Sequence, residues 1–253
     1  MTSGVMITAL LLLLKPPRSL SSSQSGHDRF KWGVATSALQ IEGCLSCENR
    51  QASIWDQYNN GENSDSPARA DNSYVQYKDD VRLIKNMGLN AYRFSISWSR
   101  IITVVNSTRS KVNIEGVKHY NDLINELISN DIEPYVTLYH WDMPLYYELN
   151  YNSWLEPVAI IKDFRAYADV CFDAFGDRVK MWFTINEPWT FTVMGYIVGA
   201  WPPMRCSNRH SCTQGSCARR DVHYSFIHSF IHSFIHSFIH LFICSFIRSF
   251  VIT

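Results

Sequence analysis

The sequence lacks an excess of charge of either sign, because 23 lysine and arginine residues are matched by 23 aspartate and glutamate residues. Proteins that bind nucleic acid or anionic lipid surfaces need a basic field to attract their partner. The composition therefore argues against both kinds of partner and favours an uncharged one. The sequence also lacks any run of 18 apolar residues, so no stable membrane span is expected.

A zinc-binding pattern is missing from the cluster formed by Cys206, Cys212 and Cys217. The nearest zinc set would have to recruit His210, and its spacing is unlike the usual Cys-x2-Cys pairs. These cysteines lie in a polar segment, where a loop disulfide formed in an oxidising compartment is the more natural interpretation. The odd total of seven cysteines leaves at least one of them unpaired.

The N-terminus carries an apolar run over residues 5–14, followed by Lys15, two prolines and a serine-rich stretch to Ser25. The run is too short to span a bilayer and has the outline of a secretory signal peptide. It has no preceding Lys or Arg and no clean cleavage site, so an uncleaved anchor is the alternative. The Asn106-Ser107-Thr108 sequon agrees with export, and a secreted or lumenal location is expected.

Between residues 30 and 200, apolar segments typical of strands alternate with longer segments in which apolar residues recur every three to four positions. Helices are predicted over residues 73–87, over 116–129 and from Pro157 to Gly176. The predicted strands lie at residues 30–37, 90–97, 134–140 and 180–186. This alternation indicates an α/β fold with a parallel sheet, and four strands are half of a TIM (β/α)8 barrel.

The most informative string is Thr184-Ile185-Asn186-Glu187-Pro188-Trp189, at the C-terminal end of the last predicted strand. A parallel barrel places its active site at that end of its strands. A glycosidase needs a carboxylic acid there to protonate the leaving oxygen, and a hydrogen-bonding neighbour for the sugar 2-hydroxyl. The 14% of aromatic residues suits a sugar site and equally a tryptophan-rich core.

Polar and aromatic strings accompany the other predicted strands in the same way. They are Ser37 to Gly43, Tyr92 to Ser95 and Tyr139 to Asp142, with further strings at Ser53–Asp56, Tyr77–Val81, Ser95–Ile101, Tyr120–Ile124 and Phe175–Lys180. In this order they resemble the N-terminal half of glycoside hydrolase family 1, the β-glucosidase, myrosinase and lactase family. The resemblance covers roughly residues 28–205 and implies a TIM barrel truncated to about its first four βα units.

The resemblance implies a retaining β-glycosidase of the β-glucosidase type, with a small-molecule β-glycoside as substrate and with no cofactor or metal. Glu187 would be the general acid and then the general base, and Asn186 would bind the 2-hydroxyl. The other matching residues are the non-reducing-sugar binders Gln40, His140 and Trp141 and the nucleophile-supporting Arg93. These four have structural alternatives, as a loop cap, a strand-end histidine, a core indole and an ion-pair partner respectively.

The sequence departs from the family pattern in two loops. After Glu42-Gly43, where Cys44 and Leu45 stand, relatives usually continue Ala-Trp and a glycine-rich turn, and Ile102 to Ser110 lacks the usual Pro and Gly. These changes leave the geometry of the loops near the site open. The segment from Arg205 to Ser216 resembles the disulfide-closed loop of the plant-type members.

One catalytic group of the family is missing from the sequence. The family's nucleophile is a Glu in a Thr-Glu-Asn-Gly string, which does not occur here. Asp142 and Glu148 are not expected to replace it, because their spacing is unlike that of a nucleophile. A retaining cycle needs two carboxyl groups, so this chain by itself is expected to be inactive.

The C-terminal segment has a different character, because Ser225-Phe226-Ile227-His228 recurs as a four-residue unit through His240 and then degrades. No familiar repeat architecture has this period, and the unit moves around a helix by about 40° per step, so no fixed face forms. A tetranucleotide DNA repeat read in triplets encodes such a period. We therefore predict a translated low-complexity repeat, with a membrane anchor and an aggregation-prone strand as alternatives.

The expected organisation is a signal peptide and linker over 1–25, half of a glycoside hydrolase barrel over 26–216, and the repeat tail over 217–253. The first function hypothesis is a secreted β-glycosidase. The second is a non-catalytic klotho-like module that binds a sugar or a protein, or a pseudogene product. The presence of Glu187 favours the enzyme, whereas the sugar, the aglycone and the oligomeric state stay open.

Overall fold

The computed structural model describes residues 30–58, 70–106 and 109–206. The expected signal peptide, the repeat tail and the cysteines after Cys206 lie outside the described residues, so the predictions made for them stay predictions. In the described ranges, no helix combines the length and the apolar character needed to cross a membrane.

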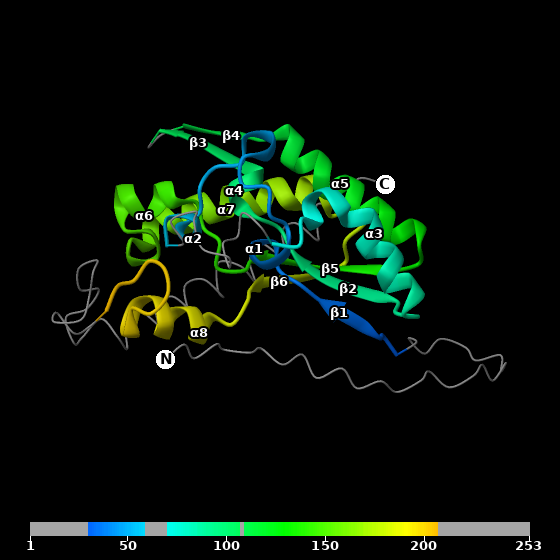
Figure 1. Ribbon diagram of the computed structural model, residues 1–253. Coiled ribbons are helices and arrows are strands. Elements are labelled where there is room, and N and C mark those ends of the chain that lie inside the picture. The colour runs from blue at the N-terminus through cyan, green and yellow to red at the C-terminus, as the bar shows by residue number, and fades with distance from the viewer. Residues whose placement is uncertain (1–29, 59–69, 107–108, 207–253) are drawn as a thin grey trace. The chain divides into compact units, whose positions relative to one another are not determined.

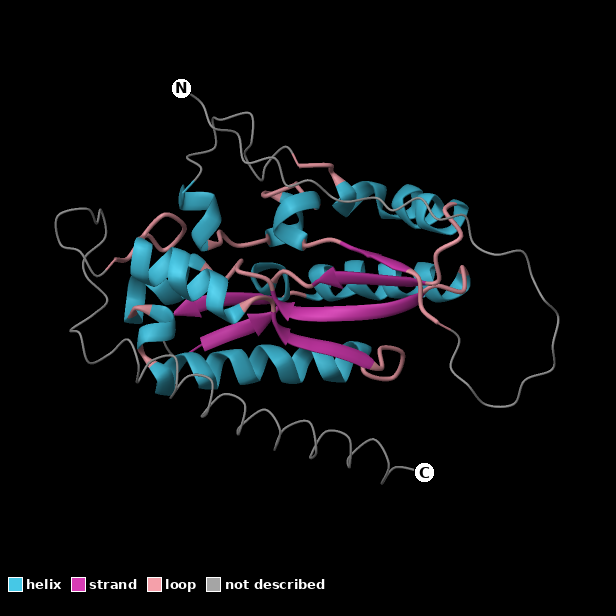
Figure 2. Ribbon diagram, turned by 90° about the horizontal axis from the view of Figure 1, so that it is seen from below, coloured by secondary structure: helices cyan, strands magenta, loops and turns pink. Residues whose placement is uncertain are grey.

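Four parallel strands form the central sheet in the order β1-β2-β5-β6 (Figures 1 and 2). Their bounds are Gly33–Ala35 for β1, Ala91–Ser95 for β2, Glu133–Tyr139 for β5 and Met181–Ile185 for β6. All four predicted strands are confirmed, although β1 is shorter than its apolar run. At Gly33, where β1 begins, an added Cβ would lie 2.6 Å from the carbonyl oxygen of Ala91, so this close approach of the two strands requires glycine.

The three predicted long helices are also confirmed, as α3 over Ser73–Asn86, α5 over Ile114–Ser129 and α7 over Pro157–Phe175. Pro157 suits the first helical position because the N–H it lacks would have no partner there. The helix α5 buries the predicted apolar stripe, including Ile124. Figure 1 shows the three helices on the same side of the sheet, as expected for successive βα units.

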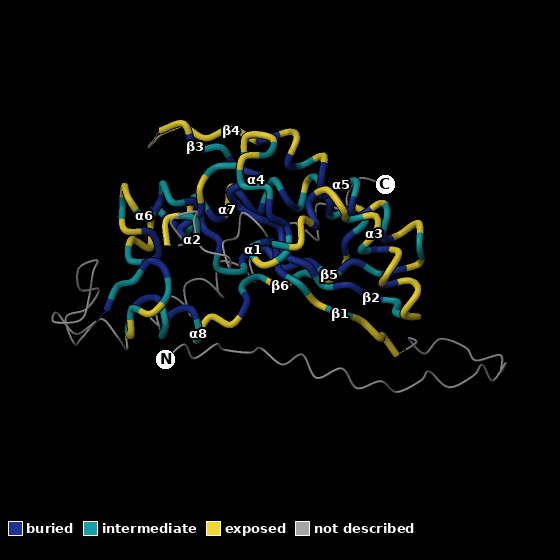
Figure 3. Tube along the Cα trace, in the orientation of Figure 1, coloured by how far each residue is buried: buried dark blue, intermediate teal, exposed yellow. Residues whose placement is uncertain are grey.

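Buried segments lie between the sheet and the helices (Figure 3), and the core there includes many aromatic side chains. The fully buried Trp98 stacks on Tyr167, with ring centroids 5.1 Å apart, and meets Phe164 edge to face at 5.3 Å. The Tyr167 hydroxyl lies 3.1 Å from the carbonyl oxygen of Ile96 and 2.8 Å from that of Leu138. The Tyr167 hydroxyl on α7 therefore contacts the carboxyl-end segments of β2 and β5, at the rim where the polar and aromatic strings were expected to meet.

An antiparallel hairpin was not predicted from the sequence. It is formed by β3 at Ile102–Asn106 and β4 at Arg109–Val112. The run of β-branched residues in β3 favours a strand. The Gln51 side chain accepts a hydrogen bond from the Val104 N–H at 2.7 Å and donates one to the Val104 carbonyl oxygen at 2.9 Å. This side-chain amide therefore anchors the hairpin to the segment that precedes α2, about fifty residues earlier in the sequence.

Short helical segments fill the connections at the carboxyl ends of the strands. They are α1 (Ala38–Ile41), α2 (Ile54–Tyr58), α4 (Trp98–Ile101), α6 (Leu145–Tyr151), α8 (Pro188–Thr192), the 3-10 turns Cys47–Asn49 and Ser153–Leu155, and a π-helical segment at Val193–Val198. Such segments are too short to show an apolar period in the sequence, which is why they were not predicted.

Among the described residues, the outer strands β1 and β6 each pair on one side only. Met181 and Phe183 on β6 are 45% and 39% exposed, and Trp32 before β1 is 51% exposed. Interior strands of a closed barrel bury such side chains on both faces. The described sheet is therefore an open, partial barrel with its apolar interior surface uncovered.

Candidate active site

The carboxyl ends of the parallel strands bring the predicted site residues to one rim. Gln40 lies in α1 just after β1, Arg93 lies in β2, His140 and Trp141 follow β5, and Asn186 and Glu187 follow β6. The strand order β1-β2-β5-β6 makes these segments spatial neighbours. Side chains from four separate parts of the sequence therefore border the same rim, as is usual for the active sites of parallel barrels.

Arg93 links β2 to the adjacent strand β5 and to the residue that follows β6. Its Nε donates a hydrogen bond to Thr137 Oγ1 at 2.9 Å, and its Nη2 donates one to Asn186 Oδ1 at 2.7 Å. The guanidinium also lies over the ring of Phe183, 4.7 Å from the centroid. Because the Asn186 oxygen is taken up by Arg93, the amide nitrogen is the donor that Asn186 can offer to a ligand.

Glu187 is an exposed residue in a left-handed backbone conformation. Its φ of 42° and ψ of 63° are left-handed, it precedes Pro188 at the start of α8, and it is exposed. A left-handed residue other than glycine is held against a backbone cost, and such residues cluster at functional sites. Burial lowers the pKa of Arg93, and the Glu187 carboxylate opposes that shift, so the two charges lie within electrostatic reach.

Trp141 is held at the same rim by one hydrogen bond from its side chain and one to its backbone. Its Nε1 donates to the Asn186 carbonyl oxygen at 2.8 Å, while its own carbonyl oxygen accepts from Trp55 Nε1 at 3.0 Å. Its ring lies 5.1 Å from that of Trp201, which in turn lies 6.1 Å from that of Trp55. The three indoles form an apolar wall beside Asn186. The sequence did not assign Trp55 or Trp201 to the site, because nothing local shows that they meet.

His140 and Gln40 add hydrogen-bonding groups to the rim. Burial, with a smaller contribution from the Arg93 charge, lowers the pKa of His140 to about 4, so its imidazole is neutral at physiological pH. A neutral imidazole offers one donor and one acceptor, which suits a sugar hydroxyl. Gln40 is exposed and its Oε1 accepts a hydrogen bond from Ser37 Oγ at 2.7 Å, so its amide nitrogen is the group available as a donor.

The comparisons with known proteins agree with this geometry. The chain matches the family described as "Glycosyl hydrolase family 1" over residues 23–237. The chain belongs to glycosyl hydrolase family 1. It is 44% identical over 237 residues to Beta-glucosidase 12 of Oryza sativa subsp. japonica, which covers 87% of this chain and 45% of that protein. It is 48% identical over 194 residues to Beta-glucosidase 40 of Arabidopsis thaliana, covering 74% of this chain and 37% of that protein.

Solved structures of family 1 enzymes show the same fold. Rice Os3BGlu6 β-glucosidase is 43% identical with a TM-score of 0.68, covering 74% of this chain and 39% of its own. The family 1 β-glucosidase of Thermotoga maritima is 38% identical with a TM-score of 0.64, covering 69% and 39%. The described fold is therefore part of a family 1 TIM barrel, as predicted. The chain spans less than half the length of these relatives.

Asp142 and Glu148, the two carboxylates that the sequence analysis set aside as nucleophiles, are not exposed. Asp142 is 1% exposed, and neither of its oxygens has a hydrogen-bond partner in the described ranges. Glu148 accepts hydrogen bonds from Arg205 Nε at 2.7 Å and from Ser153 Oγ at 2.5 Å. Neither is exposed on the rim as Glu187 is.

Asp142 has a raised pKa of about 7 in this family 1 chain. Burial is the main cause, while the nearby Ser97 hydroxyl and the Arg50 charge work in the opposite direction. The folded state favours the protonated form of a carboxyl whose pKa is raised by folding. The stabilising contribution is complete below the unfolded pKa of about 4 and is lost as the pH rises through the folded pKa of about 7. Native stability should therefore fall over this window because ionised Asp142 is buried without sufficient compensation.

We expect Asp142→Asn to remove this pH dependence. The free energy of unfolding of the variant should rise relative to that of the original chain as the pH increases from 5 to 8. The difference should grow by up to about 1.4 kcal/mol per pH unit, as long as the pH lies between the unfolded and folded pKa values of Asp142. Urea unfolding at both pH values measures the difference. Asp131→Asn is the matched control, because Asp131 is 91% exposed in its pair with Lys85. An Asp142→Asn effect of equal size at both pH values would contradict the assignment.

Proposed function

We propose that this chain supplies the acid/base half of a retaining β-glycosidase site, of the β-glucosidase type. The observation that carries the proposal is the placement of Glu187. It is an exposed carboxylate at the end of β6, adjacent to Asn186, whose side chain is held by Arg93. A proton donor next to an oriented amide is what cleavage of a glycosidic bond requires. The relatives named above are β-glucosidases.

In the proposed mechanism, Glu187 first donates its proton to the glycosidic oxygen as the bond to the anomeric carbon breaks. It then removes a proton from the water that hydrolyses the glycosyl intermediate. Asn186 donates from its amide nitrogen to the sugar 2-hydroxyl. Hydrogen bonds at this position strengthen as positive charge develops in the transition state, so the Arg93 contact acts by fixing the direction of that donor.

The non-reducing sugar is proposed to lie against Trp141, with the His140 and Gln40 side chains on its hydroxyl groups. An indole provides a flat apolar face for a sugar ring, and the neutral imidazole can both donate and accept. The rings of Trp201 and Trp55 enlarge the apolar surface that begins at Trp141. It would suit an apolar portion of a substrate.

The attacking carboxylate is proposed to come from outside this sequence. A retaining site places two carboxyl groups about 5–5.5 Å apart on either side of the scissile bond. The sequence has no Thr-Glu-Asn-Gly string, Asp142 is buried and Glu148 is bound to Arg205. A mutant of rice Os3BGlu6 β-glucosidase has been solved in a covalent complex with glucose, which agrees with a nucleophilic route in the family. We therefore propose that this chain by itself does not turn over.

A route through the secretory pathway is part of the proposal. It is supported by the apolar run at residues 5–14 and by the sequon at Asn106. Asn106 is exposed at the end of β3, as an acceptor for a glycan must be. Export would also provide the oxidising conditions in which disulfides persist.

The stereochemistry of the product tests the proposed function. A polypeptide that joins this chain to a family 1 C-terminal half is expected to hydrolyse an aryl β-glucoside and to release the β-anomer of the sugar first, as followed by proton NMR. The first-formed α-anomer would overturn the retaining mechanism. Turnover by the chain without the second half would overturn the proposed division of the two carboxylates.

A further inference from the structure

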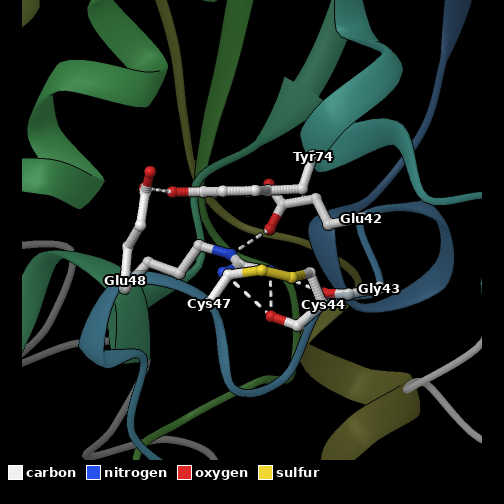
Figure 4. Close-up of a disulfide and its surroundings, with 7 residues drawn as sticks. Glu42, Gly43, Cys44, Cys47, Glu48 and Tyr74 are labelled. Atoms are coloured by element: carbon white, nitrogen blue, oxygen red, sulfur yellow. Dashed lines mark hydrogen bonds and ion pairs between the residues drawn. A yellow bond between two sulfur atoms is a disulfide. The ribbon is translucent and has the colours of Figure 1, made fainter.

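We propose that the disulfide between Cys44 and Cys47 is a thiol–disulfide exchange site, with a dithiol as its reaction partner. The two cysteines are three residues apart and both are half-buried, in the loop that follows α1 (Figure 4). The exchange chemistry itself does not depend on the glycosidase proposal, whereas the consequence for Gln40 does.

The loop closed by this disulfide has an unusual backbone. Gly43, Cys44, Glu48 and Asn49 have φ values of 63°, 48°, 52° and 61°. Only glycine adopts this left-handed region without a steric cost, and asparagine tolerates it better than most residues. Cys44 and Glu48 are therefore held in a costly conformation by their surroundings. A covalent link between Cys44 and Cys47 restrains the segment that lies between these positions.

The loop is connected to a buried ionic network below it. Arg100 Nε donates to Glu42 Oε2 at 2.6 Å, and its Nη2 donates to the Gly43 carbonyl oxygen at 2.6 Å and to that of Cys44 at 3.4 Å. The Tyr120 hydroxyl donates to the other Glu42 oxygen at 2.7 Å. These contacts place the first half of the loop directly on side chains of α4 and α5.

The second half of the loop is anchored through Glu48. Its carboxylate accepts a hydrogen bond from the Tyr74 hydroxyl of α3 (Figure 4). Its carbonyl oxygen accepts one from Asn113 Nδ2 at 2.8 Å. Gln40 in α1 lies four residues before Cys44. A change in the loop can therefore reach α1, which carries one of the proposed sugar-binding side chains.

Three features favour reduction of this disulfide. A short closed loop gains little from the restriction of the unfolded chain, so the bond contributes less stability than one that closes a long loop. Both cysteine residues are half-buried rather than enclosed in the core, and thiol–disulfide exchange needs such access for an attacking thiolate. Cys44 itself lies in the left-handed region, at a φ of 48°, and opening the bond removes a restraint on this costly backbone conformation.

The exchange is written with all atoms and electrons balanced. A thiolate of the dithiol attacks Cys47 Sγ, a new S–S bond forms, and the Cys44–Cys47 bond breaks with its electron pair leaving on Cys44 Sγ. The second thiolate of the dithiol then attacks the first dithiol sulfur, which is bonded to Cys47 Sγ in the mixed disulfide. That bond breaks and Cys47 is released as a thiolate. The dithiol becomes a cyclic disulfide, two electrons pass to the protein, and both released thiolates can take up a proton.

Alkylation and amide hydrogen exchange of the full chain under increasing dithiothreitol test the proposal. Reduction should make Cys44 and Cys47 alkylable together and should raise hydrogen exchange in residues 38–50 by roughly tenfold or more, because the loop loses its closing bond. Oxidised dithiothreitol should restore slow exchange. Cys44→Ser/Cys47→Ser should exchange fast without reductant and should not respond to it.

Two controls separate this site from the other cysteines. Cys171→Ser alters a buried thiol and should keep the full response of the original chain. The double serine variant keeps the disulfide of Cys206, so a response to dithiothreitol in residues 38–50 of that variant would overturn the proposal. Absence of alkylation at Cys44 and Cys47 under excess dithiothreitol would also overturn it. None of these readouts requires hydrolysis, so a failure of the proposed function would be seen separately.

Discussion

Glu187→Gln, in a complete enzyme that carries this chain, is expected to slow the hydrolysis of glycosides with poor leaving groups by about 10²–10⁴-fold. An alkoxide is a poor leaving group and needs the proton that Glu187 donates, and glutamine cannot supply it. An activated aryl glycoside leaves as a stable phenolate and needs little protonation, so its glycosylation step should be much less affected. The ratio of kcat/KM for the two substrate types, measured in the original enzyme and the variant, reports this difference.

Glu115→Gln is the matched control for that experiment. Glu115 is also an exposed glutamate, but it lies in the first turn of α5 and has no contact with the rim residues described above. Its substitution should leave both substrates unaffected. An equal loss on both substrate types in Glu187→Gln would show that the residue does not act as the general acid. A loss of fold in that variant would be recognised by circular dichroism before the kinetics are compared.

Arg100→Met is expected to lower the free energy of unfolding by about 3–5 kcal/mol. The Arg100 side chain is 2% exposed and the Glu42 side chain 9% exposed, with 2.6 Å between Nε and Oε2. Burial opposes the charge on Arg100, but Glu42 and Tyr120 more than offset it and raise its pKa. Removing the guanidinium would leave the Glu42 carboxylate buried without its counter-charge. The guanidinium also covers the ring of Tyr74, 3.9 Å from the centroid.

Urea unfolding of a protein that carries this chain measures the loss at Arg100. Arg82→Met is the matched control, because the Arg82–Asp79 pair on α3 is exposed by 69% and 56% and should contribute less than about 1 kcal/mol. Glu42→Gln/Arg100→Met removes both charges and should recover part of the stability. A loss below about 1 kcal/mol for Arg100→Met would contradict the assigned role of the pair.

The sequence by itself determined the order of the four sheet strands and the three long helices, and it determined the family. The stripe along α5 and the apolar runs of β2, β5 and β6 are periodic in the sequence, and the observed bounds differ from the predicted ones by only one or two residues. Family membership followed from short strings in a fixed order, which a one-dimensional comparison can detect. The position of Glu187 at a strand end was predictable for the same reason, because strand ends and helix starts leave local signals.

Only the tertiary structure decided which of these residues touch. Arg93 and Asn186 are 93 positions apart and are joined because β2 and β6 both flank β5 in register. The wall of Trp55, Trp141 and Trp201, and the burial of Asp142 beside an exposed rim, likewise depend on how distant segments pack. The Cys44–Cys47 bond depends on left-handed residues that no periodic pattern reveals. Local periodicity specifies elements, whereas contacts between distant side chains arise only once register and packing set their distances.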